Sequence, residues 1–379
     1  MDRYEVVTTP EAFLALRGPW DELCARAHAR FVGQTFDWAW LCWQTVAHPR
    51  GRTLACIVAR SGDRLVLAWP LAISRDGWRG ATARPLDSET SEYSDILVED
   101  GPDARGRVAC AFAMLRRARA CDRLELANVR ADTLLASVLA SPPQGPKPMR
   151  AGSMSAASVN WHGIDSWDGY IEALDAKERR ELGRKKRRLE EQAPLRMDAV
   201  RDAGEAAAVI DWTLDRKLAW LETTGRHNDW IATPEHRAFL KASMAALGPA
   251  GRRVIFVLRL GETIIAMLLS SVGDTQLEWF MCASDPAYSR QSPAQVLREY
   301  VLRWAYERRL DCDFRMGEQR FKALWGNAVT PTSTWIVANS LRGRAWVSGS
   351  RAKRALAARV PARARAVLKA MVHAERARS

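Results

Sequence analysis

The stretch DPAYSRQSPAQ, residues 285–295, lies between a run of alternating apolar residues and a strongly amphipathic pattern at about 293–309. Ser292 suits the N-cap of that helix, Pro293 its first turn, and Gln295 the third helical position, where it completes a capping box. Apolar residues then recur with a period of 3.6. The pattern predicts a helix whose start is held rigidly at the end of a sheet.

The start of such a helix presents free backbone N–H groups and the positive end of the helix dipole. The turn therefore predicts an anion-binding site that holds a pyrophosphate, with Arg290 as the counter-charge. Its predicted residues are Ser289, Arg290, Gln291, Ser292 and Gln295. An ordinary, well-capped helix start is the alternative interpretation.

The order of elements around this turn occurs twice in the chain. In the second half, apolar alternation predicts strands at 253–260, 263–272, 275–283 and 311–315, with the helix before the last strand. In the first half, the same reasoning predicts strands at 54–60, 65–73, 93–98 and 123–126, with a helix at about 103–119. The chain is therefore predicted to be duplicated, on its architecture rather than on residue identity.

A connector rich in proline separates the two halves. Residues 141–148 contain four prolines and a glycine, which favour an extended linker. The length of 379 residues also exceeds what one hydrophobic core usually serves. We expect an α/β protein with two tandem domains, at 1–145 and 150–346, built on mixed, mostly antiparallel sheets, and a basic tail at 347–379.

A second informative stretch, DCDFRMGEQRFKALWG, occupies residues 311–326. Gly317 interrupts the predicted strand, and Phe321, Lys322 and Trp325 then recur at helical spacing. Two motifs thus follow the second hairpin: Tyr-x-x-x-Ser-Pro at the helix start, and Asp-Phe-x-x-Gly-x-x-x-Phe-Lys-x-x-Trp after it.

These motifs, in this order, resemble the GNAT-like acyltransferases called CelD-like, which are relatives of the FemAB aminoacyltransferases. Residues of the first half that share the resemblance are Trp20, Phe36-Asp37-Trp38, Trp69-Pro70-Leu71 and Glu92-Tyr93-Ser94-Asp95. The resemblance implies two tandem GNAT-like domains, the first a degenerate copy and the second an acyltransferase. Acyl-coenzyme A, such as acetyl-CoA, would be a co-substrate rather than a permanently bound cofactor. Members often accompany the synthesis of cellulose or another exopolysaccharide.

One departure from the family pattern concerns the phosphate loop. The usual Gln/Arg-x-x-Gly-x-Gly/Ala is replaced by residues 290–295, which contain no glycine. Binding of coenzyme A therefore rests on the helix start itself.

Acyl transfer from a thioester requires a base for the attacking group and a proton for the leaving thiolate. Glu278, beside Trp279 and Phe280 on the strand before the turn, is the candidate base, since apolar surroundings raise a carboxyl pKa. A solvent-facing strand residue is the alternative. Tyr288 is the candidate proton donor, and packing at a strand end is its alternative role.

Other candidates would bind substrate. Lys322, with Phe321, matches the most recurrent family motif and suits an anionic acceptor or the donor phosphate. Glu92, Tyr93 and Asp95 lie in a polar loop of the first half and are predicted to line an acceptor cleft between the domains, unless they only cap that loop.

Basic residues are distributed unevenly. The helix predicted at about 167–192 contains a run of basic residues from Lys177 to Arg188, either a solvated face paired with nearby glutamates or a surface that holds an anionic substrate. From Arg342 onward there are eleven Lys and Arg residues against Glu375 alone, which is ten of the thirteen net positive charges. The tail is thus predicted to be disordered or to lie on an anionic membrane surface, with nucleic acid the least favoured partner.

Several other classes are disfavoured. No signal peptide, long apolar run, metal-ligand spacing, or nucleophile-elbow or Walker motif occurs, so we expect no metal and a cytoplasmic protein with peripheral contact at the inner membrane. Three functions remain: an acyl-CoA-dependent acyltransferase acting on a small-molecule or saccharide acceptor, a Fem-like transferase using aminoacyl-tRNA, and a non-catalytic accessory protein of a membrane polysaccharide synthase.

Overall fold

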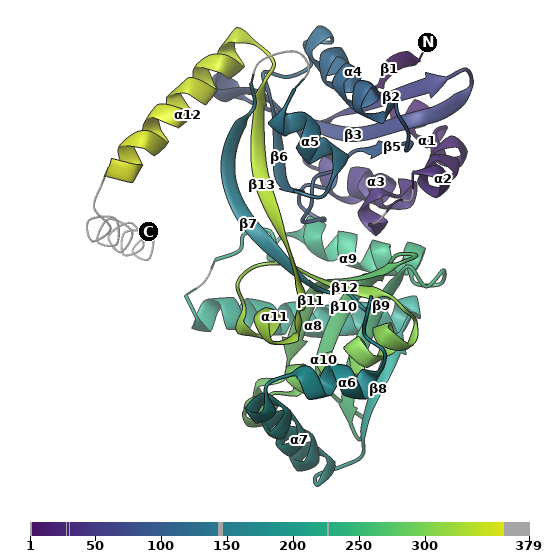
Figure 1. Cartoon of the computed structure of the whole chain (residues 1–379), viewed down its shortest axis with the longest axis vertical. Coiled ribbons are helices and arrows are strands. Elements are labelled where there is room, and N and C mark those ends of the chain that lie inside the picture. The colour runs from purple at the N-terminus through teal and green to yellow at the C-terminus, as the bar shows by residue number, and fades with distance from the viewer. Residues whose placement is uncertain (1, 28, 30, 143–146, 226, 360–379) are drawn as a thin grey trace.

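The computed structural model describes residues 2–27, 29, 31–142, 147–225 and 227–359. Within them, thirteen strands form one mixed sheet that runs through both halves of the molecule (Figure 1). Twelve follow the order β1-β2-β3-β4-β6-β13-β7-β12-β11-β10-β9-β8, and the short strand β5 pairs with β3 beside that path. Only β4 with β6 and β11 with β12 pair in parallel. The predicted α/β class, with mixed and mostly antiparallel sheets, is confirmed.

The first half contains, in chain order, β1 (Arg3–Val7), α1 (Pro10–Leu14), α2 (Arg17–Arg26), α3 (Phe36–Cys42), β2 (Thr53–Ser61), β3 (Arg64–Asp76), β4 (Gly80–Pro85), β5 (Leu97–Val98), α4 (Ala104–Arg117), β6 (Arg123–Arg130), α5 (Leu134–Ala140) and β7 (Met149–Val159). A π-helical turn at Trp43–Ala47 extends α3.

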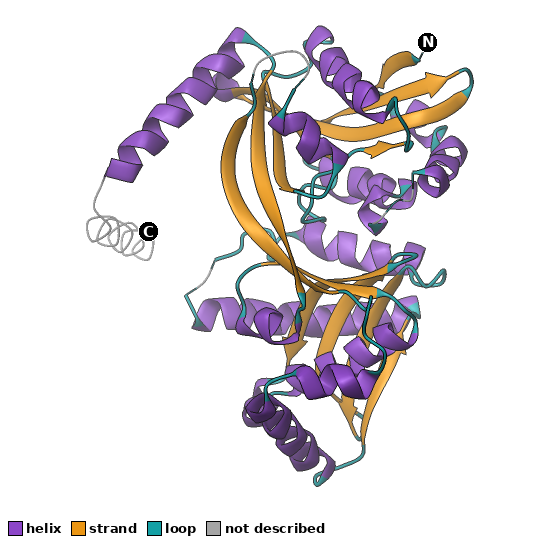
Figure 2. Cartoon of the chain, viewed as in Figure 1, coloured by secondary structure: helices purple, strands orange, loops and turns teal. Residues whose placement is uncertain are grey.

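The second half contains α6 (Trp167–Ala173), α7 (Ala176–Glu190), β8 (Leu195–Val200), α8 (Ala203–Thr223), α9 (Pro234–Leu247), β9 (Arg253–Leu260), β10 (Thr263–Val272), β11 (Gln276–Ser284), α10 (Pro293–Glu307), β12 (Asp311–Met316), α11 (Arg320–Trp325), β13 (Ala328–Ala338) and α12 (Leu341–Arg359). Figure 2 shows helices on both faces of the sheet.

The predicted duplication is present in the topology. Each half has a hairpin, a third antiparallel strand, a helix, and a strand that pairs in parallel with the third. Both hairpins turn at a glycine with positive φ, Gly62 at 61° and Gly261 at 58°, where other residues would be strained. The prediction of a strand at 93–98 was wrong: β4 is the third strand, and only Leu97–Val98 adds to β3.

Two long strands join the halves, as Figure 1 shows. Strand β7, which follows the first half in the chain, pairs with β12 and β13 of the second. Strand β13, near the end of the second half, pairs in turn with β6 of the first. Neither strand was anticipated, because each alternates small and polar residues instead of large apolar ones.

Three large hydrophobic cores lie against the sheet. Helices α4 and α5 cover one face of the first half, and α10 covers one face of the second. The third core spans both halves, because α2 and α3 pack together with α8 and α9. Trp38 illustrates this contact, since its ring lies edge-on to Phe239 of α9 at 5.1 Å and tilted against Phe280 of β11 at 5.4 Å.

Two further predictions concern helices. The single helix expected at about 167–192 is two helices, because Asp175 accepts hydrogen bonds from the N–H groups of Lys177 and Glu178 and so starts α7 anew. Helix α12 runs to Arg359, while residues 360–379 of the predicted tail lie outside the described residues. No helix in the described ranges is long and apolar enough to span a membrane.

Candidate active site

The site is built where the two parallel strands of the second half separate. Strands β11 and β12 pair over three residues each, ending at Glu278 opposite Asp313. Beyond this point β11 continues to Ser284 on its own course, and Pro286–Gln291 form a 3-10 turn that leads into α10. The two strands thus diverge after Glu278 and Asp313, and β11 leads through this turn to the start of α10.

Glu278 is buried at this divergence, with 2% of its surface exposed, so it is not a solvent-facing strand residue. Its Oε1 accepts a hydrogen bond from the N–H of Val32 in the first half at 3.2 Å. Burial raises the pKa of Glu278 to about 7, with Arg315 opposing the rise and Asp313 adding to it. A carboxyl with this pKa can accept a proton near neutral pH.

Tyr288 lies in the 3-10 turn, half-buried against the core under α10. Glu278 and Ser284 are six positions apart on β11, which at strand spacing is about 20 Å. Tyr288 follows the end of β11, in the 3-10 turn. The catalytic roles of Glu278 and Tyr288 both stay predictions.

The predicted anion turn has a different geometry from the one expected. Ser292 adopts a left-handed conformation, with φ 48° and ψ 58°, and its side chain does not cap α10. Its Oγ points toward the Ser289 carbonyl at 3.4 Å, while Gln295 accepts a hydrogen bond from Lys185 of α7 at 2.6 Å. The predicted capping box is therefore absent, although Pro293 does begin the helix. Ser289 and Arg290 are exposed, and Gln291 is half-buried.

A groove of about 430 Å³ lies between α7, the start of α10 and α11. Its basic residues are Lys177, Arg179, Lys185, Lys186 and Arg320, and its acidic residues are Asp175, Glu178, Glu181 and Glu299. Three of these acids are engaged, since Asp175 caps α7, Glu178 pairs with Arg320, and Glu181 pairs with Arg184. Of the predicted residues, Gln295 and Phe321 line this groove. The basic side chains of α7 thus face the start of α10 rather than only solvent.

Asp313 connects the two halves through a buried network. Its carboxylate accepts hydrogen bonds from the Tyr93 hydroxyl and Arg130 Nη1, each at 2.9 Å, and from Gln276 Nε2 at 3.2 Å. Glu92 accepts one from the N–H of Met316 at 2.9 Å. Two residues of the predicted first-half loop, Glu92 and Tyr93, therefore do reach the second half.

Asp95 lies elsewhere. Its carboxylate accepts a hydrogen bond from Gln34 Nε2 at 3.3 Å within the first half, beside a small hollow lined by Trp20 and Phe31. Tyr93 lines the same hollow, whereas Glu92 does not.

The motif at 313–322 shapes the end of β12. Arg315 is left-handed, with φ 60°, and its N–H donates to Asp313 Oδ1 at 2.6 Å. Lys322 donates to the Arg315 carbonyl at 3.0 Å and also to the Met316 carbonyl. Both ends of the strained Arg315 peptide are thus held by side chains of one motif.

Lys322 itself is buried, with 6% of its surface exposed, and burial lowers its pKa to about 8. Its ammonium group contacts backbone carbonyls instead of facing an open cleft, so the structure places it as a support for Arg315. Phe321 stacks on Trp279 with ring centroids 6.2 Å apart.

Sequence reasoning missed Arg253, Arg315 and Arg130, all buried. One feature of the sequence could have identified Arg253. It is a basic residue in a predicted strand that is mostly apolar, directly before a run of five apolar residues. Such a residue is rarely buried without a partner.

Comparisons with known proteins agree with this geometry. Residues 176–323, from the first residue of α7 to just past Lys322, match the family model described as an acetyltransferase (GNAT) domain. The match covers part of the second half, and the predicted enzyme class, a GNAT-type acyltransferase, is confirmed. No curated protein matches the chain.

Three solved structures share the fold over most of the chain. FemX has a TM-score of 0.62 at 10% identity, covering 89% of this chain and 97% of its own. A conserved protein of unknown function from Bacteroides thetaiotaomicron has a TM-score of 0.52 at 13% identity, covering 89% and 100%. L-PGS from Bacillus licheniformis has a TM-score of 0.51 at 11% identity, covering 90% and 96%. These identities show the fold alone, and the CelD-like part of the resemblance stays a prediction.

Proposed function

We propose that the second half transfers an acyl group from acyl-coenzyme A to an amine or hydroxyl acceptor, with Glu278 as the general base. The observation that carries this proposal is the groove between α7, the start of α10 and α11, which is lined largely by residues of the matched domain. A helix start and several lysines suit the phosphates of coenzyme A.

The chemistry assigned to the site is a single acyl transfer. The acceptor nitrogen or oxygen attacks the thioester carbonyl carbon and passes its proton to the Glu278 carboxylate. The carbon–sulfur bond then breaks, and the thiolate takes up a proton. Because its pKa is about 7, Glu278 is ionised in about half of the molecules at neutral pH and can release the proton again.

Calorimetric titration with acetyl-CoA and with free coenzyme A tests the donor. Both should bind, and Lys185→Gln should weaken both about tenfold, because a charge-assisted contact near the phosphates is lost. Lys241→Gln is the matched control, since Lys241 pairs with Asp211 on α8 and lies outside the groove. Failure of both ligands to bind would contradict the proposal.

The Fem-like alternative uses the same fold with another donor. An aminoacyl-tRNA would contact many phosphates, so its affinity would fall steeply with salt, with a slope of several charges. If the chain binds aminoacyl-tRNA with such a slope and does not bind acetyl-CoA, the donor assignment changes. Binding of neither donor would favour the non-catalytic accessory role.

The biological setting is proposed on the resemblance alone. A saccharide acceptor from exopolysaccharide synthesis would release coenzyme A thiol when mixed with acetyl-CoA and the protein. A thiol-release assay across sugars and small amines tests this, and release only with non-saccharide amines would count against it.

The basic tail is proposed to contact an anionic membrane surface. Each basic residue near such a surface adds about 1 kcal/mol, and salt weakens the attraction. Because Val347 packs in a small core with Met149 and Ile336, truncation should follow Arg359 so that the fold is kept. Truncated protein should lose flotation with phosphatidylserine vesicles; absence of flotation by the full chain would refute the contact.

A further inference from the structure

A second cavity, of about 250 Å³, lies between the two halves on the sheet face opposite α10. The first half contributes Glu89 to Glu92 to its wall, and the second contributes α8, α9 and the ends of β11 and β12. Two arginines line it, Arg253 of β9 with no exposed surface and Arg315 of β12 with 5% exposed. None of the second-half residues that the sequence predicted as catalytic or binding residues lines this cavity.

Both guanidinium groups have buried nitrogen atoms without a hydrogen-bond partner among the described residues. Arg253 Nη1 donates to Ser271 Oγ at 2.6 Å, but Nε and Nη2 find no acceptor. Arg315 Nε and Nη2 likewise find none, and the carboxylate of Glu92 is 3.8 Å from Nε. Unpaired buried donors of this kind are rare in native proteins and call for a ligand or a trapped solvent molecule.

The two groups are also close to each other and share an aromatic support. Arg315 lies 3.8 Å and Arg253 4.1 Å from the centroid of the Phe280 ring. Burial and the neighbouring charge of Arg315 lower the pKa of Arg253 to about 9, so the Arg253 guanidinium remains charged at neutral pH. Two adjacent buried cations favour an anion between them.

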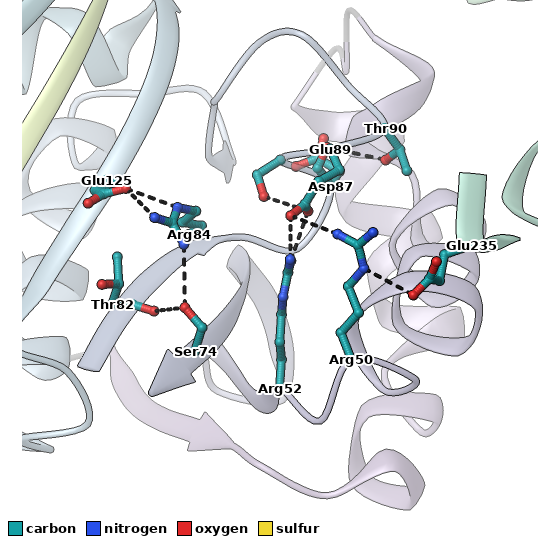
Figure 3. Close-up of polar contacts among 11 residues, drawn as sticks. Arg50, Arg52, Ser74, Thr82, Arg84, Asp87, Glu89, Thr90, Glu125 and Glu235 are labelled. Atoms are coloured by element: carbon teal, nitrogen blue, oxygen red, sulfur yellow. Dashed lines mark hydrogen bonds and ion pairs between the residues drawn. The ribbon is translucent and has the colours of Figure 1, made fainter. Parts of the chain in front are cut away.

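The acidic groups nearby are largely engaged by other partners. Glu89 pairs with Arg52 and Arg50, and Arg50 continues to Glu235 of α9, as Figure 3 shows. Glu92 accepts the Met316 N–H. Asp313 is paired with Arg130, and burial raises the pKa of Glu278 to about 7, which favours its uncharged form. Among the described residues, no carboxylate accepts a hydrogen bond from Nε or Nη2 of either arginine.

The rest of the cavity restricts the anion. Trp230, Phe239, Leu240 and Met281 provide apolar walls, so the ligand has an apolar body. Glu89 and Glu92, which also line the cavity, would repel a doubly charged phosphate more than a singly charged group. Guanidinium forks match the planar geometry of a carboxylate.

We propose that this cavity binds the acyl acceptor, as a small carboxylic acid with an apolar body whose carboxylate is held by Arg253 and Arg315. That the ligand is the acyl acceptor rests on the proposed function. That the cavity binds an anion rests only on the contacts of Arg253 and Arg315. Phe280 and Arg315 lie just beyond the last paired residues, Glu278 and Asp313. The nucleophile of a molecule anchored there would point toward the base.

Calorimetry at pH 7 with three probes tests the site: phenylacetate, its uncharged analogue phenylacetamide, and phenyl phosphate. Phenylacetate should bind at least tenfold more tightly than either other probe. Arg253→Met and Arg315→Met should each weaken phenylacetate at least tenfold. Arg196→Met, on the exposed edge strand β8, is the matched control and should bind as the wild type does.

Three outcomes overturn the inference: equal binding of phenylacetate and phenylacetamide, tighter binding of phenyl phosphate, or unchanged binding by both arginine variants. Thermal melting of the ligand-free proteins tests whether the variants are folded. Because the substitution removes an unpaired buried charge, the melting temperature of Arg253→Met should equal or exceed that of the wild type. A fall of several degrees in both variants would mean that the arginines are structural, and would also overturn the site.

The same proteins separate this inference from the proposed donor. Arg253→Met should bind acetyl-CoA as the wild type does, because Arg253 does not line the groove beside α7. If phenylacetate binds and acetyl-CoA does not, the donor proposal fails while the anion site stands. If acetyl-CoA binds and phenylacetate does not, the anion site fails alone.

Discussion

The two parallel strand pairs of the molecule have the same topology and opposite chemistry. In each, one pair of apolar residues faces the outer core: Ala83 with Leu124 in the first half, and Leu277 with Cys312 in the second. One residue further along, the first half has Arg84 bonded to Glu125, which Arg123 also contacts. The second half has Glu278 opposite Asp313 at this place.

This difference separates a structural copy from a reactive one. A salt bridge across the strands gives both charges a partner, as Figure 3 shows for Arg84 and Glu125. In the second half burial raises the pKa of both Glu278 and Asp313, and the neighbouring Asp313 adds to the rise at Glu278. Duplication thus preserved the backbone while the second half placed acids and unpaired arginines where the first half pairs its charges.

The largest effect is expected from exchanging the acid in each half for its amide. Glu278→Gln should lower kcat by roughly a hundredfold to ten-thousandfold, as loss of a general base does. Glu125→Gln should leave kcat within about twofold, because Glu125 only pairs with arginines of the first half. Thiol release from acetyl-CoA measures both, and equal losses would mean that the two positions are both structural.

A pH dependence of stability should follow the same contrast. Glu278 has a folded pKa of about 7, above its ordinary value of 4.5, so the unfolded chain loses this proton first. The free energy of unfolding is therefore highest below about pH 4.5, falls as the pH rises toward 7, and levels off above pH 7. The loss is about 3 kcal/mol by proton linkage. Urea unfolding of Glu278→Gln should lack this decline, whereas a decline that persists would place it in another group.

Much of this site was hidden in the sequence. Strands β9 and β10 were predicted with their observed bounds because they alternate apolar residues between glycine turns. The turn into α10 was located, but the conformation of Ser292 was not, since one backbone torsion decides which way a side chain points. Partners such as Tyr93 and Asp313 lie 220 residues apart, and only the crossing of β7 and β13 brings them together.

Arg315 and Asn128 give a second comparison, because both are left-handed residues in the later strand of each parallel pair. Asn128 tolerates this conformation by its nature, and its N–H donates to Thr334 Oγ1 at 3.3 Å. Arg315 depends on Lys322. Lys322→Met should therefore destabilise by about 1.5–3 kcal/mol and Thr334→Val by about 1 kcal/mol, since charged donors contribute more than neutral groups. Urea unfolding measures both, and the reverse order would contradict this account.

The smallest effect is expected from glycine at two left-handed positions, Ser292 and Asn128. Ser292 has φ 48° and no capping bond to lose, so Ser292→Gly should relieve about 1–2 kcal/mol of backbone strain. The greater freedom of glycine in the unfolded chain offsets about 0.5–1 kcal/mol of that gain, leaving a rise in stability below about 1 kcal/mol. Asn128→Gly should instead lower stability, because the Asn128 amide donates to the Glu92 carbonyl at 3.0 Å and holds the loop that reaches Met316. Thermal melting of the two variants measures this difference. If both rise together, Asn128 contributes only its backbone conformation, and the loop from Glu92 to Tyr93 must be held by its contacts with β12 alone.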